Sequence, residues 1–206
     1  MSGTYQHLTT VFLAFFAIMN PIANTAIFVG LAGKETQSVQ IKTAFKALFI
    51  SFCIIVVFAI SGKVIFHLFG ISLPALRLTG GVLVFLIGCQ MLHGESSKLH
   101  SPEDKHKADI AISPLAVPIL AGPGTIATAM NYSASGNMLE ISATIGAFFA
   151  LCVLTFISFI FGQKILHFIG EAGIAIVTRL MGLILAVIGA QMLISGVFGA
   201  IKIYAK

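Results

Sequence analysis

Long uncharged runs of apolar residues alternate with polar connections along the whole chain. Each run has close to the about 20 residues that an α-helix needs to cross the hydrocarbon core of a bilayer. A membrane β-barrel would instead show short segments of alternating apolar and polar residues. The pattern therefore predicts an all-α membrane protein with six transmembrane helices. These helices are expected at residues 8–31, 43–66, 73–92, 110–130, 139–161 and 174–198.

Two of these apolar runs are interrupted by residues that break helices. In the fourth run, Pro123 lacks an amide hydrogen and lies between two glycines, which have no Cβ atom to restrain the backbone. The first run carries a similar interruption at Asn20-Pro21. Lipid cannot satisfy the freed backbone groups, so such a break is tolerated only where it is buried in protein or lines a wet cavity. Two broken helices in matching places of two halves indicate the binding site of a transporter.

A broken helix presents the amide groups of one half-helix and the carbonyl groups of the other. The amide end suits a carboxylate, and the carbonyl end suits a cation or an ammonium group. Asparagine and threonine side chains near the breaks can orient a small polar solute. The alternative is that the prolines cause ordinary kinks, with the Asn and Thr side chains bonding back to the helix. The predicted substrate-binding residues are Asn20, Pro21, Asn24, Thr25, Gly122, Pro123, Gly124 and Thr125.

The two halves of the chain resemble each other in sequence. Several glycines, a histidine and a Gln-Met-Leu triplet recur at the same spacing, apart from one inserted residue. Because each half has three helices, the second copy must cross the membrane in the opposite direction. The sequence therefore predicts two inverted three-helix repeats, 1–92 and 110–206, each with an interrupted first helix, joined by a polar linker at 93–109. The matched positions are Gly62, His67, Gly70, Gly81, Gly88 and 90–92 in the first half, and Gly162, His167, Gly170, Gly182, Gly189 and 191–193 in the second.

The positive charges of the chain are confined to its connections and helix ends. The net charge of +5 therefore indicates membrane topology rather than nucleic-acid binding. Cytoplasmic loops carry the excess of lysine and arginine, so the richer face is predicted to be cytoplasmic and both termini extracytoplasmic. One face is expected to hold Lys34, Lys42, Lys46, Lys98, Lys105, Lys107, Lys164 and Arg179, and the other Lys63, Arg77, Lys202 and Lys206.

Composition excludes a soluble domain and offers little to an enzyme. The chain is 58% hydrophobic and 9% charged, with a mean hydropathy of +1.03, whereas soluble domains carry roughly 25% charged residues. We find no paired intramembrane aspartates, no catalytic triad and no phosphate-binding loop, so neither an enzyme nor a cofactor is expected. The three cysteines have no metal-ligand spacing, so no metal site is expected either. All carboxylates fall in loops or at helix ends, which leaves coupling to H⁺ or Na⁺ open.

Four further polar residues lie inside or next to the apolar runs. Arg77 and Arg179 stand near the starts of the third and sixth predicted helices, where they could close a gate or reach the interface. Gln90 and Gln191 occupy equivalent points in the same two helices. An amide at lipid depth is costly unless it is bonded, so both glutamines are expected to face the bundle. These four residues are candidates for a gate or for polar contacts between helices.

Five longer motifs resemble those of a known family: the runs 20–24, 69–77, 114–118, 120–124 and 178–185. In these motifs the sequence resembles the MarC family of multiple-antibiotic-resistance-locus membrane proteins, grouped with six-span neutral amino acid transporters. The resemblance covers essentially the whole chain. It implies a multi-pass protein of the bacterial inner membrane, related in fold to amino acid exporters of the lysine-exporter type. Some relatives move small neutral amino acids such as glycine and alanine.

The sequence thus favours a secondary transporter of small neutral amino acids that works by alternating access around a site between the two broken helices. Its expected partners are the lipid bilayer and a small-molecule substrate, and a homo-oligomer remains open. One alternative is a non-transporting scaffold or regulatory protein that acts through the central linker. Another is an exporter of a different small metabolite or drug.

Overall fold

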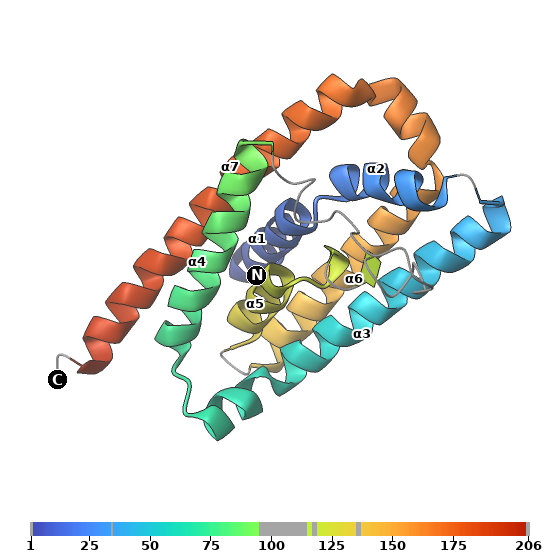
Figure 1. Ribbon diagram of the computed structural model, residues 1–206. Helices are drawn as coiled ribbons and strands as arrows, with labels where there is room; N and C mark the ends of the chain where they lie inside the picture. The colour runs from blue at the N-terminus through green and yellow to red at the C-terminus, as the bar shows by residue number, and fades with distance from the viewer. Residues whose placement is uncertain (1, 34, 95–114, 117–118, 135–136, 205–206) are drawn as a thin grey trace.

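The structure is a computed structural model, which describes residues 2–33, 35–94, 115–116, 119–134 and 137–204. No β-strand occurs among these residues, so the predicted all-α class is confirmed. Almost all of the predicted polar linker, 95–109, lies outside the described residues. The helices are α1 (Ser2–Met19), α2 (Pro21–Ala32), α3 (Gln37–Phe69), α4 (Leu73–Leu92), α5 (Pro123–Ser133), α6 (Met138–Ile160) and α7 (Gly162–Tyr204) (Figure 1).

Five helical stretches of the described residues are long and apolar enough to cross a membrane, where six were predicted. The remaining predicted helix, 110–130, is only partly described, because residues 110–114 and 117–118 lie outside the described residues. Its last turn before the break is wound loosely, with the Ala121 amide donating to the carbonyl of Ala116 at 2.9 Å, and α5 then begins at Pro123 and has only 11 residues. The helix breaker therefore does more than bend this run, because it ends one helical segment and starts a short second one.

The helices pack as a bundle whose interior is filled by aromatic and aliphatic side chains. Helix α6 lies against α1 and α3, and α5 lies against α3 and α4. Phe28 of α2 stacks on Phe159 of α6 with ring centroids 4.4 Å apart, and both are almost fully buried. Many large apolar side chains are instead exposed on the outside of the bundle. An apolar outer surface is what a lipid environment requires.

Helices α4 and α7 run side by side through four glycines (Figure 1). Gly81 meets Gly189, and Gly88 meets Gly182, so the two helices are antiparallel. A Cβ atom added to any of the four would lie 2.7–2.9 Å from the carbonyl oxygen of the facing glycine, which is too close for a real side chain. Small residues that let helix backbones touch are typical of membrane helix interfaces.

Glycines also shape the chain where it changes direction. Gly70 follows α3 with φ of 63°, and Gly170 bends α7 with φ of 69° and ψ of 168°. These backbone conformations favour glycine because other residues would place a Cβ atom against the backbone. The two residues are matched positions in the predicted repeat, so the sequence match extends to an unusual backbone conformation.

Contacts between distant segments fix which connections share an end of the bundle. At one end, the Gln163 side chain donates to the carbonyl of Gly33 at 3.1 Å. At the opposite end, the His7 and Tyr132 rings lie 6.0 Å apart, and Arg77 donates to Asn131 at 3.2 Å. The start of α1 and the end of α5 therefore lie at the same end of the bundle.

Candidate functional site

The first break, between α1 and α2, is stabilised by hydrogen bonds of its own side chains. Asn20 adopts the left-handed conformation, with φ of 39° and ψ of 75°, and its Oδ1 accepts a hydrogen bond from the amide of Ala23 at 3.3 Å. Asparagine tolerates this conformation better than most residues, and its short side chain is a good helix cap. Pro21 then starts α2 at the position where its missing N–H costs least. The Asn24 amide bridges the break by donating to the carbonyl of Met19.

The second break is built differently, because no side chain in the described part of the chain caps the new helix. Gly122 is extended, with φ of −75° and ψ of 171°, and Pro123 is the first residue of α5. The carbonyl of Gly122 accepts the first helical hydrogen bond, from the amide of Ile126 at 3.0 Å. The first amides of a helix have no partner within it. Those of Gly124 and Thr125 therefore begin α5 without a capping side chain.

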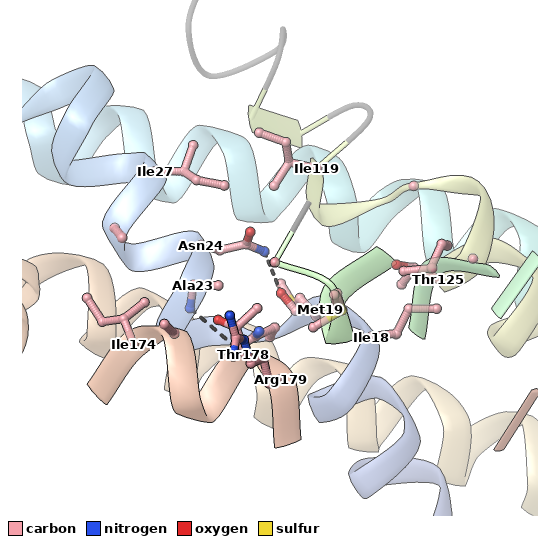
Figure 2. Close-up of a pocket in the computed structure, with 18 of the residues that line it drawn as sticks. Ile18, Met19, Ala23, Asn24, Ile27, Ile119, Thr125, Ile174, Thr178 and Arg179 are labelled. Atoms are coloured by element: carbon pink, nitrogen blue, oxygen red, sulfur yellow. Dashed lines mark hydrogen bonds between the residues drawn. The ribbon is translucent and has the colours of Figure 1, made fainter. Parts of the chain in front are cut away.

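A cavity of about 530 Å³ lies between the two breaks (Figure 2). Six of the eight predicted binding residues line it: Asn20 and Asn24 from the first break, and 122–125 from the second. Pro21 and Thr25 do not. Thr25 is fully buried and its hydroxyl donates to the carbonyl of Pro21 at 2.7 Å, so it bonds back to its own helix. The structure thus brings the two interruptions, about a hundred positions apart in the sequence, to one cavity.

The four further polar residues separate in the structure. Arg179 lines the cavity, whereas Arg77 lies at the far end of the bundle and bonds to Asn131. Neither glutamine lines the cavity, and Gln191 is exposed, which corrects the expectation that it faces the bundle. The reason is helical geometry: Gln191 follows Gly189 by two residues, about 200° around the axis, so it points away from the contact with α4.

The third wall of the cavity comes from α7, and apart from Arg179 its residues were not predicted from the sequence. Glu171, Ile174, Ala175 and Thr178 line it in a stripe at the spacing of one helix face. Figure 2 shows Ile174 and Thr178 together with Arg179 on this helix, facing α2. The sequence indicated only that these residues share one face of a helix. That spacing does not determine which neighbouring helix the face contacts.

The lining combines aliphatic surface with a few polar groups. Ile18, Ile27, Ile87, Ile119 and Met91 supply much of the apolar wall. The polar groups are the two asparagines, two threonines, the bare amides of α5, and the charges of Glu171 and Arg179. A mostly apolar pocket with a few convergent polar groups is the usual form of a small-molecule site. No three His, Cys, Asp or Glu side chains gather as metal ligands in the described part of the chain.

Comparisons with known proteins place the chain in a family. The family model of the MarC family integral membrane proteins matches residues 5–201. The chain is 38% identical over 202 residues to the membrane protein YvbG of Bacillus subtilis, covering 95% of this chain and 96% of YvbG. It is 34% identical over 203 residues to the inner membrane protein MarC of Salmonella arizonae, covering 91% and 92% of the two chains. No solved structure matches the chain.

Proposed function

We propose that this chain, which belongs to the MarC family of integral membrane proteins, is a secondary transporter of small neutral amino acids of the glycine and alanine type. The observation that carries the proposal is the cavity between the two helix breaks. A bilayer-spanning protein gains nothing in stability from two broken helices around a hollow. The same arrangement is useful when backbone amides and carbonyls must contact a solute.

The cavity suits a zwitterion with a small side chain. Its volume of about 530 Å³ falls within the range of small-molecule sites, roughly 300–1,000 Å³. The amides at the start of α5 and the Arg179 guanidinium favour a carboxylate, whereas Glu171 favours an ammonium group. The isoleucines around them leave an aliphatic side chain in apolar surroundings. One small amino acid can therefore place its carboxylate, its ammonium group and its side chain against the parts of the lining that suit each of them.

Alternating access requires two halves that can move against each other, and we propose that these are inverted three-helix repeats. Reciprocal glycine contacts support this: exchanging matched positions turns the Gly81–Gly189 contact into the Gly182–Gly88 contact. Contacts are exchanged in this way when a two-fold axis relates the two halves. Because α4 and α7 are antiparallel, that axis would be perpendicular to both helices. Gly70 and Gly170, which are matched positions, both have a positive φ, of 63° and 69°.

The proposal is tested by solute flux into proteoliposomes that hold the purified protein. We expect saturable uptake of labelled glycine or alanine above the background of empty vesicles, and imposed H⁺ or Na⁺ gradients will identify any coupling ion. The Gly124→Leu variant should lose the flux, because a side chain there enters the cavity. The atoms nearest to a Cβ atom at Gly124 belong to the side chains of Ile18 and Ile87, which can shift, so the variant should still fold.

The matched control is Gly146→Leu. Gly146 lies on the exposed side of α6 with no atom within 4 Å of an added Cβ, so this variant should transport normally. Equal flux through Gly124→Leu and Gly146→Leu would reject the site. No flux of glycine or alanine through folded wild-type protein, under any gradient, would reject the proposed substrate class.

A further inference from the structure

We infer that the anionic group of the solute binds at the start of α5 and not at the start of α2, and that the Asn20 side-chain nitrogen is its side-chain donor. This inference rests on the proposed function and deepens it. Both broken helices offer an amide end, and either could hold a carboxylate in principle. The two ends differ in how much of their hydrogen-bonding capacity is already used.

The start of α2 is largely occupied by its own chain. The Asn20 side chain accepts from the amide of Ala23, and the Asn20 carbonyl accepts from the amide of Asn24 at 3.0 Å. Pro21 has no amide hydrogen to offer. An anion at this end would have to displace the Asn20 cap and lose the hydrogen bond that the cap makes.

The start of α5 also has a proline as its first residue and makes the equivalent helical hydrogen bond, from the amide of Ile126 to the carbonyl of Gly122, so the two starts differ in the side-chain cap. None of the described side chains caps the start of α5, and Gly124 and Thr125, whose amides are the second and third of the helix, both line the cavity. Gly124 has no Cβ atom, so a ligand can approach its backbone closely. The partial positive charge of a helix start then acts on the bound group in a cavity whose lining is mostly apolar.

Asn20 supplies a second, independent sign of a ligand. Its Oδ1 is bound to the amide of Ala23, which fixes which side of the amide carries the nitrogen. The nitrogen, Nδ2, is buried and has no hydrogen-bond partner among the residues that the structure describes, and Asn20 is only 4% exposed. A buried donor without a partner is unfavourable, and native proteins rarely leave one unless it has a use. Because Asn20 lines the cavity, an anionic solute is the acceptor that this donor lacks.

The charges around the cavity are consistent with this polarity. Arg179 and Glu171 both line it, and both are exposed. The guanidinium adds to the attraction for an anion, whereas the carboxylate repels an anion and suits an ammonium group. Asn24 gives its nitrogen to the carbonyl of Met19, so its remaining polar atom is an oxygen, an acceptor for the same ammonium group.

The test measures binding of labelled alanine to the purified protein and its displacement by two analogues. Propionate keeps the carboxylate and lacks the ammonium group, and alaninamide keeps the ammonium group and lacks the carboxylate. In the wild type we expect propionate to displace alanine, and alaninamide to bind at least about tenfold more weakly than alanine, because hydrogen bonds to a charged group are the strong ones.

Two variants of Asn20 separate its cap from its donor. Asn20→Asp keeps an oxygen for the Ala23 amide and replaces the nitrogen by a charged oxygen, so alanine affinity should fall at least about tenfold while alaninamide binding is not weakened. Asn20→Gly accepts the backbone conformation but loses both groups, and it uncovers the start of α2. It should also bind alanine more weakly. Melting temperatures of both variants will show that they fold.

The outcomes distinguish this inference from the proposed function. Unchanged alanine binding in Asn20→Asp would overturn the inference and leave the transporter proposal intact. Tighter binding in Asn20→Gly would also overturn it, because that result assigns the anion to the uncovered start of α2. A wild-type protein that binds and transports no alanine would overturn the proposed function, and the inference with it.

Discussion

Helices α4 and α7 approach each other so closely at Gly88 that one added methyl group should destabilise the protein. A Cβ atom added to Gly88 of α4 would lie 2.4 Å from the amide nitrogen of Ala186 and 2.7 Å from the carbonyl oxygen of Gly182. Both neighbours are backbone atoms of α7, so no rotamer change can relieve the overlap. Ordinary contacts begin near 3.4 Å, so α4 and α7 must separate by about 1 Å for Gly88→Ala to fold.

The free energy of unfolding should fall because the added methyl group overpacks the contact between α4 and α7. Overpacking of a well-packed core costs typically about 1–3 kcal/mol, and contact with backbone puts this case at the upper end. Alanine regains about 1 kcal/mol over glycine in a helix interior. The net loss should therefore be about 2 kcal/mol, which lowers the melting temperature of a chain of this size by about 4–8 °C.

The assay is thermal unfolding of the purified protein in detergent, followed by helical circular dichroism because the chain has no tryptophan. Gly146→Ala is the control, since no atom lies within 4 Å of its added Cβ, and its melting temperature should stay level or rise. If Gly88→Ala melted at or above the wild-type temperature, as the control should, the two backbones could not be in contact at Gly88. The reciprocal packing of α4 and α7 would then be refuted.

Two other substitutions test separate parts of the fold. Gly170→Ala should lower the free energy of unfolding by about 1–3 kcal/mol, although the space around the residue is empty, because its backbone conformation is almost restricted to glycine. Gly30→Ala, at an equally uncrowded position, is the control and should not destabilise the protein. Equal melting temperatures for the two variants would show that the bend does not exist. Phe28→Ala should cost about 3–5 kcal/mol, because it removes a buried ring stacked on Phe159, and a loss below about 1 kcal/mol in denaturant unfolding would contradict that packing.

Local features of the fold could be predicted from the sequence because lipid leaves few choices. An apolar run of about 20 residues has to be helical, and α4 occupies the predicted residues 73–92. Proline next to glycine or asparagine marked both breaks correctly. The last apolar run, predicted as a helix over 174–198, corresponds to the part of α7 that follows Gly170, whose φ of 69° and ψ of 168° are not helical. The hydropathy pattern did not indicate the short helical part from Gly162 to Gly170, because polar residues such as Gln163 lower the hydropathy there.

The candidate site was only partly predictable, because a site depends on which side chains turn towards it. Asn24 and Thr25 are neighbours with similar polarity, yet Asn24 lines the cavity and Thr25 bonds to the carbonyl of Pro21. The rotamer of each side chain and the helix face on which it lies determine whether it turns towards the cavity, and neither can be read from the sequence. The wall from α7 depends on tertiary packing between segments far apart in the chain, so its residues could not be assigned to the site from spacing alone.

The most direct test of the account asks whether the solute occupies the cavity. A single cysteine in place of Ala175, which is exposed and lines the cavity, is introduced into a chain whose three native cysteines are replaced. A cysteine in place of Ala172, exposed on α7 but outside the cavity, is the control. Saturating alanine should slow alkylation of Ala175→Cys several-fold and leave Ala172→Cys unchanged. Equal alkylation rates of Ala175→Cys with and without alanine, in protein that transports it, would contradict a binding site between the two broken helices.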